Sequence, residues 1–152
     1  YDVELTLVGE GSETSTLRRI VQVEQIHGCV NFPGRLSFES LVEQLKNSDV
    51  YVSMVATVGT SASFLEAMSC GLYPIVTDIP GFREWIISEQ NGILVPPNNV
   101  IALVEALKKI INGEVDLEAA RIANRQSIVE FADLNKCMTD AAELYEEVLL
   151  RQ

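Results

Sequence analysis

One stretch near the middle of the chain constrains the fold most, because it combines a strand, a small-residue loop and a helix in immediate succession. Residues 50–55 are mostly apolar, which is typical of a strand buried on both faces. Residues 59–63 form a loop of small side chains, and the helix that follows is expected to stop at Gly71. The side chains expected to face the core from this helix are Phe64, Leu65 and Met68. This succession is the repeating unit of an α/β fold.

The loop before that helix has the features of an anion site. The first amide groups of a helix lack partners within the helix, and its dipole favours negative charge there. The loop residues are small enough for a phosphate to approach the main chain: Gly59, Thr60, Ser61, Ala62 and Ser63. Glu66 follows within the helix and could accept hydrogen bonds from the two hydroxyls of a ribose. The alternative is an ordinary turn with a solvated glutamate. The chain has no Gly-Lys-Ser/Thr phosphate loop, which would be stronger evidence for a phosphate site.

Strands and helices alternate along the rest of the chain. Four further apolar runs predict strands, at residues 3–8, 29–32, 73–78 and 92–95. Helices are expected at residues 12–26, 38–47, 82–88, 99–111, 117–131 and 134–150. This order predicts an α/β fold with a Rossmann-like parallel sheet covered by helices on both faces.

Polar residues at the expected helix starts predict three N-caps. Ser12 and Ser37 precede the first two helices, and either Asn98 or Asn99 precedes the fifth. Gly28 marks the end of the first helical segment.

Four loops are expected to share the edge of the sheet where ligands bind in such folds, beyond the carboxyl ends of the strands. They are residues 9–12, 33–37, 57–63 and 78–82. Arg35 and Arg83 lie on or beside these loops. Each arginine could meet an anion, or could instead be a surface or ion-pair residue.

The charge and the cysteine content of the chain limit the kinds of partner and ligand that it is expected to bind. The 152 residues carry a net charge of −11, which argues against nucleic acid and anionic membrane surfaces as direct partners. The three cysteines, Cys29, Cys70 and Cys137, fit no zinc spacing and are expected to be reduced. The single histidine, His27, is expected at a helix end rather than at a metal or catalytic site.

Six linked blocks of sequence resemble the C-terminal half of glycosyltransferase family 4. The blocks are Val8-Gly9-Glu10-Gly11, Val30-Asn31-Phe32-Pro33-Gly34-Arg35-Leu36, Ser48-Asp49-Val50-Tyr51-Val52, Leu65-Glu66-Ala67-Met68-Ser69-Cys70-Gly71, Pro74-Ile75-Val76-Thr77-Asp78-Ile79-Pro80-Gly81 and Asn91-Gly92-Ile93-Leu94-Val95-Pro96-Pro97. They cover nearly the whole chain. Their linked order is specific, whereas any one block alone would not be.

The resemblance implies one half of a two-domain GT-B enzyme. Residues 1–152 would form the C-terminal nucleotide-sugar-binding domain, truncated at its N-terminal side, with the helices at about 117–150 packed on it. The whole enzyme would be a retaining hexosyltransferase that needs no metal or other cofactor. It would take a UDP- or GDP-sugar and pass the sugar to a saccharide or glycolipid held by a missing N-terminal domain. Its expected place is the cytoplasm or the inner membrane face, with any membrane contact through that missing half.

The resemblance also implies roles for individual residues. Glu66 matches the second acid of the family's E-x7-E motif and would bind the ribose hydroxyls. Amides near Ala62 and Ser63 would hold the diphosphate, within a donor loop that begins at Gly59. The Gly34-Arg35-Leu36 loop would frame the base through its main chain, and the turn at Gly9 would line the cleft.

The chain departs from the family at two points. Val58 stands where the first acid of the motif is expected to meet the donor sugar, so no catalytic residue is assigned. Hydroxyls of Thr57, Thr60 or Ser61 could hold the sugar instead, or the domain could have lost transfer activity. The family's basic pair would lie upstream of residue 1, so this chain alone is expected to be inactive.

Two other classes of protein remain as alternatives. One is a non-catalytic sugar-nucleotide-binding or regulatory domain. The other is a nicotinamide-dependent dehydrogenase domain, which is disfavoured because Thr14 occupies the third glycine position of G-x-G-x-x-G.

Overall fold

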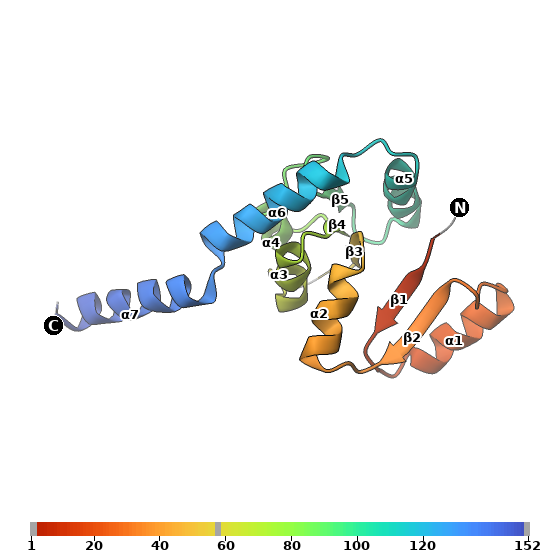
Figure 1. Cartoon of the computed structure of the whole chain (residues 1–152), viewed down its shortest axis with the longest axis horizontal. Coiled ribbons are helices and arrows are strands. Elements are labelled where there is room, and N and C mark those ends of the chain that lie inside the picture. The colour runs from red at the N-terminus through yellow and green to blue at the C-terminus, as the bar shows by residue number, and fades with distance from the viewer. Residues whose placement is uncertain (1–2, 57–58, 151–152) are drawn as a thin grey trace. The chain divides into compact units, whose positions relative to one another are not determined.

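The computed structural model describes residues 3–56 and 59–150. Val58, the position expected to carry the first acid of the motif, lies outside the described residues, as does Thr57. The chain divides into two compact units, Tyr1–Gln44 and Leu45–Gln152. Figure 1 gives the order of their helices and strands.

The first unit contains two parallel strands and a helix. Its elements are β1 (Leu5–Val8), α1 (Thr14–Val23), β2 (Val30–Gly34) and the larger part of α2 (Phe38–Lys46). Leu5 is paired with Val30 and Thr6 with Asn31, and the register shifts before Val8, which is paired with Gly34. The β–α–β order and the parallel pairing agree with the predicted α/β class.

The second unit contains a three-stranded parallel sheet and most of the helices. Its elements after α2 are β3 (Val50–Ser53), α3 (Ala62–Ser69), β4 (Tyr73–Thr77), α4 (Pro80–Arg83), β5 (Ile93–Val95), α5 (Val100–Ile111), α6 (Leu117–Phe131) and α7 (Leu134–Leu150). The strand order is β3-β4-β5, and every residue of the central strand β4 is buried. A nearly continuous apolar strand is expected where helices cover both faces of a sheet.

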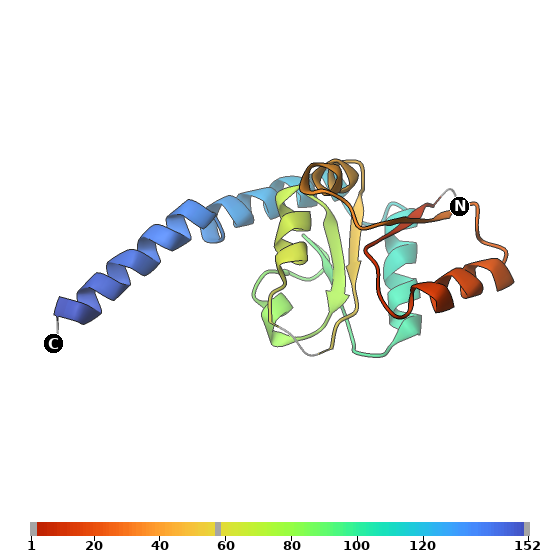
Figure 2. The same cartoon turned by 90° about the horizontal axis from the view of Figure 1, so that it is seen from below.

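Helices do cover both faces of this sheet. On one face, Phe64 of α3 and Phe82 of α4 pack with Val76 of β4. On the other, Ala106 of α5 packs with Tyr73 of the same strand. Figure 2 shows the strands between α3 on one side and α5 on the other. The predicted fold class, a Rossmann-like parallel sheet with helices on both faces, is therefore confirmed in this unit.

Several predicted element boundaries are wrong. The helix expected at residues 12–26, with Gly28 at its end, is α1, which begins at Thr14 and ends at Val23. The strand expected at residues 29–32 is β2, which extends to Gly34. The strand expected at residues 50–55 ends at Ser53, where its pairing with β4 ends, and the Thr77 hydroxyl donates to the Ser53 carbonyl at 3.5 Å. The short helix expected at residues 82–88 is α4, which begins at Pro80 and ends at Arg83. Proline favours a helix start because its missing amide would have no partner there.

The cap predictions are mostly correct. Asn99, one of the two candidates, accepts from the Ala102 amide at 3.0 Å, and Ser37 accepts from the Ser40 amide at 3.2 Å. The prediction for Ser12 is wrong: α1 begins at Thr14, and the Thr14 hydroxyl accepts from the Gly11 amide at 3.0 Å. The N-cap residue is therefore Glu13, one residue later than expected, and its side chain makes no capping hydrogen bond.

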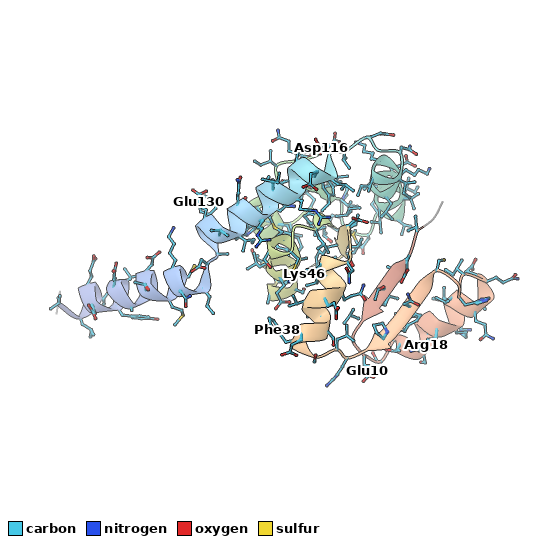
Figure 3. All side chains as sticks on the ribbon, in the orientation of Figure 1. Glu10, Arg18, Phe38, Lys46, Asp116 and Glu130 are labelled. Carbon is cyan, nitrogen blue, oxygen red and sulfur yellow. The ribbon has the colours of Figure 1, made fainter. Side chains whose placement is uncertain are left out.

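The last two helices differ in their packing. Helix α6, whose ends are marked by Asp116 and Glu130 in Figure 3, packs on α3 and β4 and buries Ala120 and Asn124. Helix α7 has no buried residue. Packing of the whole segment 117–150 on one domain of residues 1–152 therefore stays a prediction. Within the described residues, no helix is long and apolar enough to cross a membrane.

Candidate functional site

The loop before α3 is tied to the loop after β4 by a single threonine. The Thr60 hydroxyl donates to the carbonyl of Gly81 at 3.0 Å. The same oxygen accepts from the indole nitrogen of Trp85 at 3.2 Å. Both loops leave the carboxyl ends of neighbouring parallel strands, β3 and β4, which is where ligands bind in open α/β sheets.

Gly81 allows the two loops to touch through their backbones. A Cβ at this position would lie 2.8 Å from the Thr60 nitrogen and 2.9 Å from both the Cα and the carbonyl carbon of Gly59. Real Cβ atoms essentially never come so close to backbone atoms. Position 81 thus requires glycine because a Cβ would clash with these backbone atoms, and not because of an unusual backbone angle.

The N-terminus of α3 is capped but keeps two free amides. Ser61 is the N-cap, and its hydroxyl accepts from the Phe64 amide at 3.3 Å. The Ser63 hydroxyl lies 2.9 Å from the Tyr51 hydroxyl. The amides of Ala62 and Ser63 make no hydrogen bond to another described residue. These are the donors that a helix start offers to an anion.

Glu66 lies one helical turn after those amides. Residues four apart share one face of a helix, so Ala62 and Glu66 lie on the same side of α3. The Glu66 side chain is half-buried. Its carboxylate makes no hydrogen bond or ion pair with any other residue in the described ranges, 3–56 and 59–150. An unpaired, half-buried carboxylate beside free amides can accept hydrogen bonds from a ligand that also carries an anionic group.

The end of α3 fixes the direction of the helix. The Gly71 amide donates to the Met68 carbonyl at 2.9 Å, and the Leu72 amide donates to the Ala67 carbonyl at 3.0 Å. With Gly71 at φ +85°, this is the left-handed ending that the sequence predicts. A Cβ on Gly71 would lie 2.4 Å from Cγ of Arg121 on α6. Helix α3 is thus fixed against α6 at the end opposite the free amides.

Arg83 is an ion-pair residue in this structure. Its Nε and Nη2 atoms donate to the two carboxylate oxygens of Asp78 at 2.6 and 3.1 Å. These hydrogen bonds hold the pKa of Asp78 below its ordinary value and raise the pKa of Arg83. Of the two roles that the sequence left open for Arg83, the geometry shows the ion pair.

The corresponding loops of the first unit are joined by backbone. The Gly9 amide donates to the Gly34 carbonyl at 2.8 Å. Both glycines have positive φ, +110° and +75°. Arg35 is exposed and lies 4.0 Å from the carboxylate of Glu10. The structure thus brings Gly9 and Gly34 together, with Leu36 half-buried just beyond.

Sequence reasoning missed Trp85 and the contact made by Gly81. Trp85 lies in a segment expected to be plain helix, and no periodicity indicates that its indole reaches a loop 25 residues away. No pattern in the sequence indicates that Gly81 meets the backbone of Gly59 and Thr60. In the described part of the chain, no group of three or more histidine, cysteine or acidic residues is placed to hold a metal ion.

Comparison with known proteins places this geometry in a family. The family model for glycosyl transferases group 1 matches residues 1–127. An uncharacterized glycosyltransferase of Methanocaldococcus jannaschii is 30% identical over 110 residues, which are 72% of this chain and 28% of that protein. A GDP-mannose-dependent mannosyltransferase of Corynebacterium glutamicum is 26% identical over 134 residues, which are 84% of this chain and 34% of that protein. The chain thus spans about a third of the length of these relatives.

Solved structures agree on the fold. The pneumococcal O-GlcNAc transferase in complex with UDP and GlcNAc has a TM-score of 0.82 and 27% identity, over 96% of this chain and 29% of that one. The sucrose-phosphate synthase of Thermosynechococcus elongatus has a TM-score of 0.85 and 22% identity, over 98% of this chain and 39% of that one. The chain belongs to the group 1 glycosyltransferase family and has the Rossmann-like α/β architecture of GT-B glycosyltransferases.

Proposed function

We propose that this chain is the donor-binding domain of a retaining, metal-independent enzyme of glycosyltransferase family 4. It binds a nucleoside diphosphate sugar, and the intact protein transfers the sugar to a saccharide or glycolipid acceptor. The observation that carries the proposal is the pairing of two free amides, at Ala62 and Ser63, with the unpaired carboxylate of Glu66.

The amides suit the diphosphate. Free N–H groups at a helix start, together with the helix dipole, favour a bound anion without a cationic side chain. Gly81 packs against the backbone of Gly59 and Thr60 in the loop before them, which fixes that part of the loop. A phosphate can therefore approach the main chain at a place whose shape is set before it binds.

The carboxylate of Glu66 suits the ribose. Its two oxygens can accept from two neighbouring hydroxyls, and the 2′ and 3′ hydroxyls of a ribose form such a pair. Because Glu66 lies one turn from Ala62 on the same face of α3, one nucleotide could meet both groups. Hydrogen bonds to a charged group are worth roughly 1.5–3 kcal/mol, about twice a neutral one.

The relatives support a nucleoside diphosphate and leave its base open. One relative is named for GDP-mannose, and one solved neighbour holds UDP. Framing of the base by Gly34, Arg35 and Leu36, and a cleft lined by Gly9, stay predictions about the first unit. Sugar contact at Val58 stays a prediction outside the described residues.

The test is nucleotide binding by the 152-residue chain and by its Glu66→Gln variant. We expect the wild type to bind UDP or GDP with roughly millimolar affinity, since neutral amides and one carboxylate hold the ligand. Glu66→Gln should weaken binding of the ribonucleotide by about tenfold, with a smaller loss for its 2′-deoxy analogue. The matched control is Glu130→Gln, which removes the same charge from the exposed surface of α6.

The outcomes separate the possibilities. No detectable binding of either nucleotide would overturn the proposal. Equal losses for the ribonucleotide and its 2′-deoxy analogue would show that Glu66 does not read the 2′ hydroxyl. Binding without transfer in the intact protein would favour the non-catalytic alternative, and glycosyl transfer by the 152-residue chain alone would contradict its expected inactivity.

A further inference from the structure

We propose that Trp85 is a positioning residue for the donor loop, an inference that rests on the proposed function. Its indole N–H donates to the Thr60 hydroxyl at 3.2 Å, and Thr60 stands two residues before the free amide of Ala62. Its hydrogen bond is to a hydroxyl of the donor loop, so the role does not require Trp85 to touch the ligand. It acts through Thr60 by holding the loop in the shape that presents the amides.

The hydrogen-bond directions at Thr60 make this role specific. An indole N–H can only donate, so the Thr60 oxygen must accept from Trp85. The one hydroxyl proton of Thr60 is then directed to the Gly81 carbonyl at 3.0 Å. Thr60 therefore links the β3–α3 loop to the β4–α4 loop with both of its functions in use, and its proton is not available to a sugar.

The segment that carries Trp85 is itself held by hydrogen bonds to buried asparagine residues. The Asn91 side-chain amide donates to the Trp85 carbonyl at 2.9 Å, and the Asn91 carbonyl accepts from Asn124 of α6 at 3.0 Å. Asn91 is 4% exposed and Asn124 is fully buried. The Trp85 side chain also packs against the core cluster that contains Phe64 and Phe82. The indole thus links the exposed donor loop to the packed core.

Such a link matters because binding is stronger when the site is ordered in advance. A loop that must be immobilised by its ligand costs part of the binding free energy. Removing one hydrogen bond of this kind is worth roughly 0.5–1.5 kcal/mol, which corresponds to a two- to twelvefold change in affinity.

The main experiment measures UDP affinity, and GDP affinity in parallel, for the 152-residue chain and four variants. Trp85→Phe keeps a ring but removes the donor, and Thr60→Val keeps the branched shape but removes the hydroxyl. Each should weaken binding about three- to tenfold. The double variant should bind no more weakly than Thr60→Val, because Thr60→Val already removes the hydrogen bond that Trp85→Phe removes, together with the bond to Gly81. Thr60→Ser keeps the hydroxyl and should restore nearly wild-type affinity.

A second readout needs no ligand. Trp85 is the single tryptophan of the chain, so its indole N–H gives one assignable nitrogen–proton signal. Thr60→Val should shift that signal and speed its hydrogen exchange, whereas Thr60→Ser should leave both nearly unchanged. If Trp85 only packed against the core, its indole signal would not change when the Thr60 hydroxyl is removed.

The matched control is Tyr73→Phe. Tyr73 is a buried aromatic residue whose hydroxyl donates to the Glu89 carbonyl at 3.3 Å, in the segment that carries Trp85. Its loss should leave nucleotide affinity within about twofold of wild type, since it does not touch the donor loop.

Three results would overturn the positioning role. They are wild-type affinity in Trp85→Phe, additive losses in the double variant, and an indole signal that ignores Thr60→Val. Wild-type affinity in Trp85→Phe would leave the proposed function standing. Absence of UDP and GDP binding by the wild type would overturn both proposals, whatever the indole signal shows.

Discussion

The two units hold their strand-end loops by different means. In the first unit, backbone meets backbone: the Gly9 amide donates to the Gly34 carbonyl, and both glycines adopt positive φ. In the second unit, the loops touch through their backbones at Gly81, and side-chain hydrogen bonds are added to this contact, with Thr60 between Gly81 and Trp85. A loop fixed by backbone depends on glycine conformations, whereas a loop fixed by side chains depends on particular functional groups and on what supports them.

The two units also differ in how many of their residues are buried. Among residues 3–44, only Val30 is buried. In the second unit, all five residues of β4 are buried, and Phe64 and Phe82 pack with ring centroids 4.8 Å apart. A side-chain link such as Trp85 can order a loop only where a packed core holds the other end, so the second unit can use this device and the first relies on its main chain.

Gly81→Ala should break the side-chain-held loop and have the largest effect. The new methyl group would meet the backbone of Gly59 and Thr60, neither of which can rotate away. We expect a loss of about 3 kcal/mol in the free energy of unfolding, at the upper end of overpacking costs. Urea denaturation gives the value. Gly59→Ala is the matched control, because its Cβ would meet nothing within 4 Å, and an equal loss there would contradict the contact argument.

Alkaline pH should lower the free energy of unfolding, by somewhat less than Gly81→Ala does. Burial and the nearby Glu89 raise the pKa of Tyr73 from 10.0 to about 12. A raised pKa in the folded chain means that this stabilisation is complete below pH 10 and is lost as pH rises to 12. The loss should reach about 2 kcal/mol at pH 12, at 1.4 kcal/mol per unit of pKa shift.

Tyr73→Phe should remove that part of the pH dependence. The measurement is urea denaturation of both chains between pH 9 and pH 12. If the difference between them stays constant over that range, Tyr73 does not titrate as described. Backbone contacts such as the one between Gly9 and Gly34 do not titrate, so a pH dependence that Tyr73→Phe removes belongs to the packed core of the second unit.

Gly34→Ala should disturb the backbone-held loop and have the smallest effect of the three. Alanine at φ +75° costs about 1–2 kcal/mol, and its Cβ would lie 3.2 Å from the flexible carboxylate of Glu10, which can move aside. The expected result is faster hydrogen exchange at the Gly9 amide and little change at Ala62 and Ser63. Gly11→Ala, with open space around it, should leave all three amides unchanged.

Long elements with clear periodicity could be predicted from the sequence. The bounds of α6 and α7 agree with the prediction, and Asn99, Ser37 and Gly71 have their expected roles at helix ends. These features depend on a few neighbouring residues, so a local pattern is enough to find them.

Features that depend on distant parts of the chain could not be predicted in this way. Strand β3 ends where its pairing with β4 ends, so Met54 and Val55 lie beyond the strand although they are apolar. Ala67 is fully buried in α3, whereas Leu65 is only half-buried against the core cluster. The link from Trp85 to Thr60 spans 25 residues, and its existence depends on the sheet bringing two loops together.

The place of the single tryptophan has a practical consequence. Its ring is half-buried, with its carbon atoms against the core and its nitrogen on the loop. Indole fluorescence responds to the polarity around the ring, so the emission of the chain reports the hydration of one spot at the edge of the sheet. The protein therefore carries an intrinsic optical probe bonded to the loop that is proposed to hold the nucleotide, and no dye has to be attached to follow it.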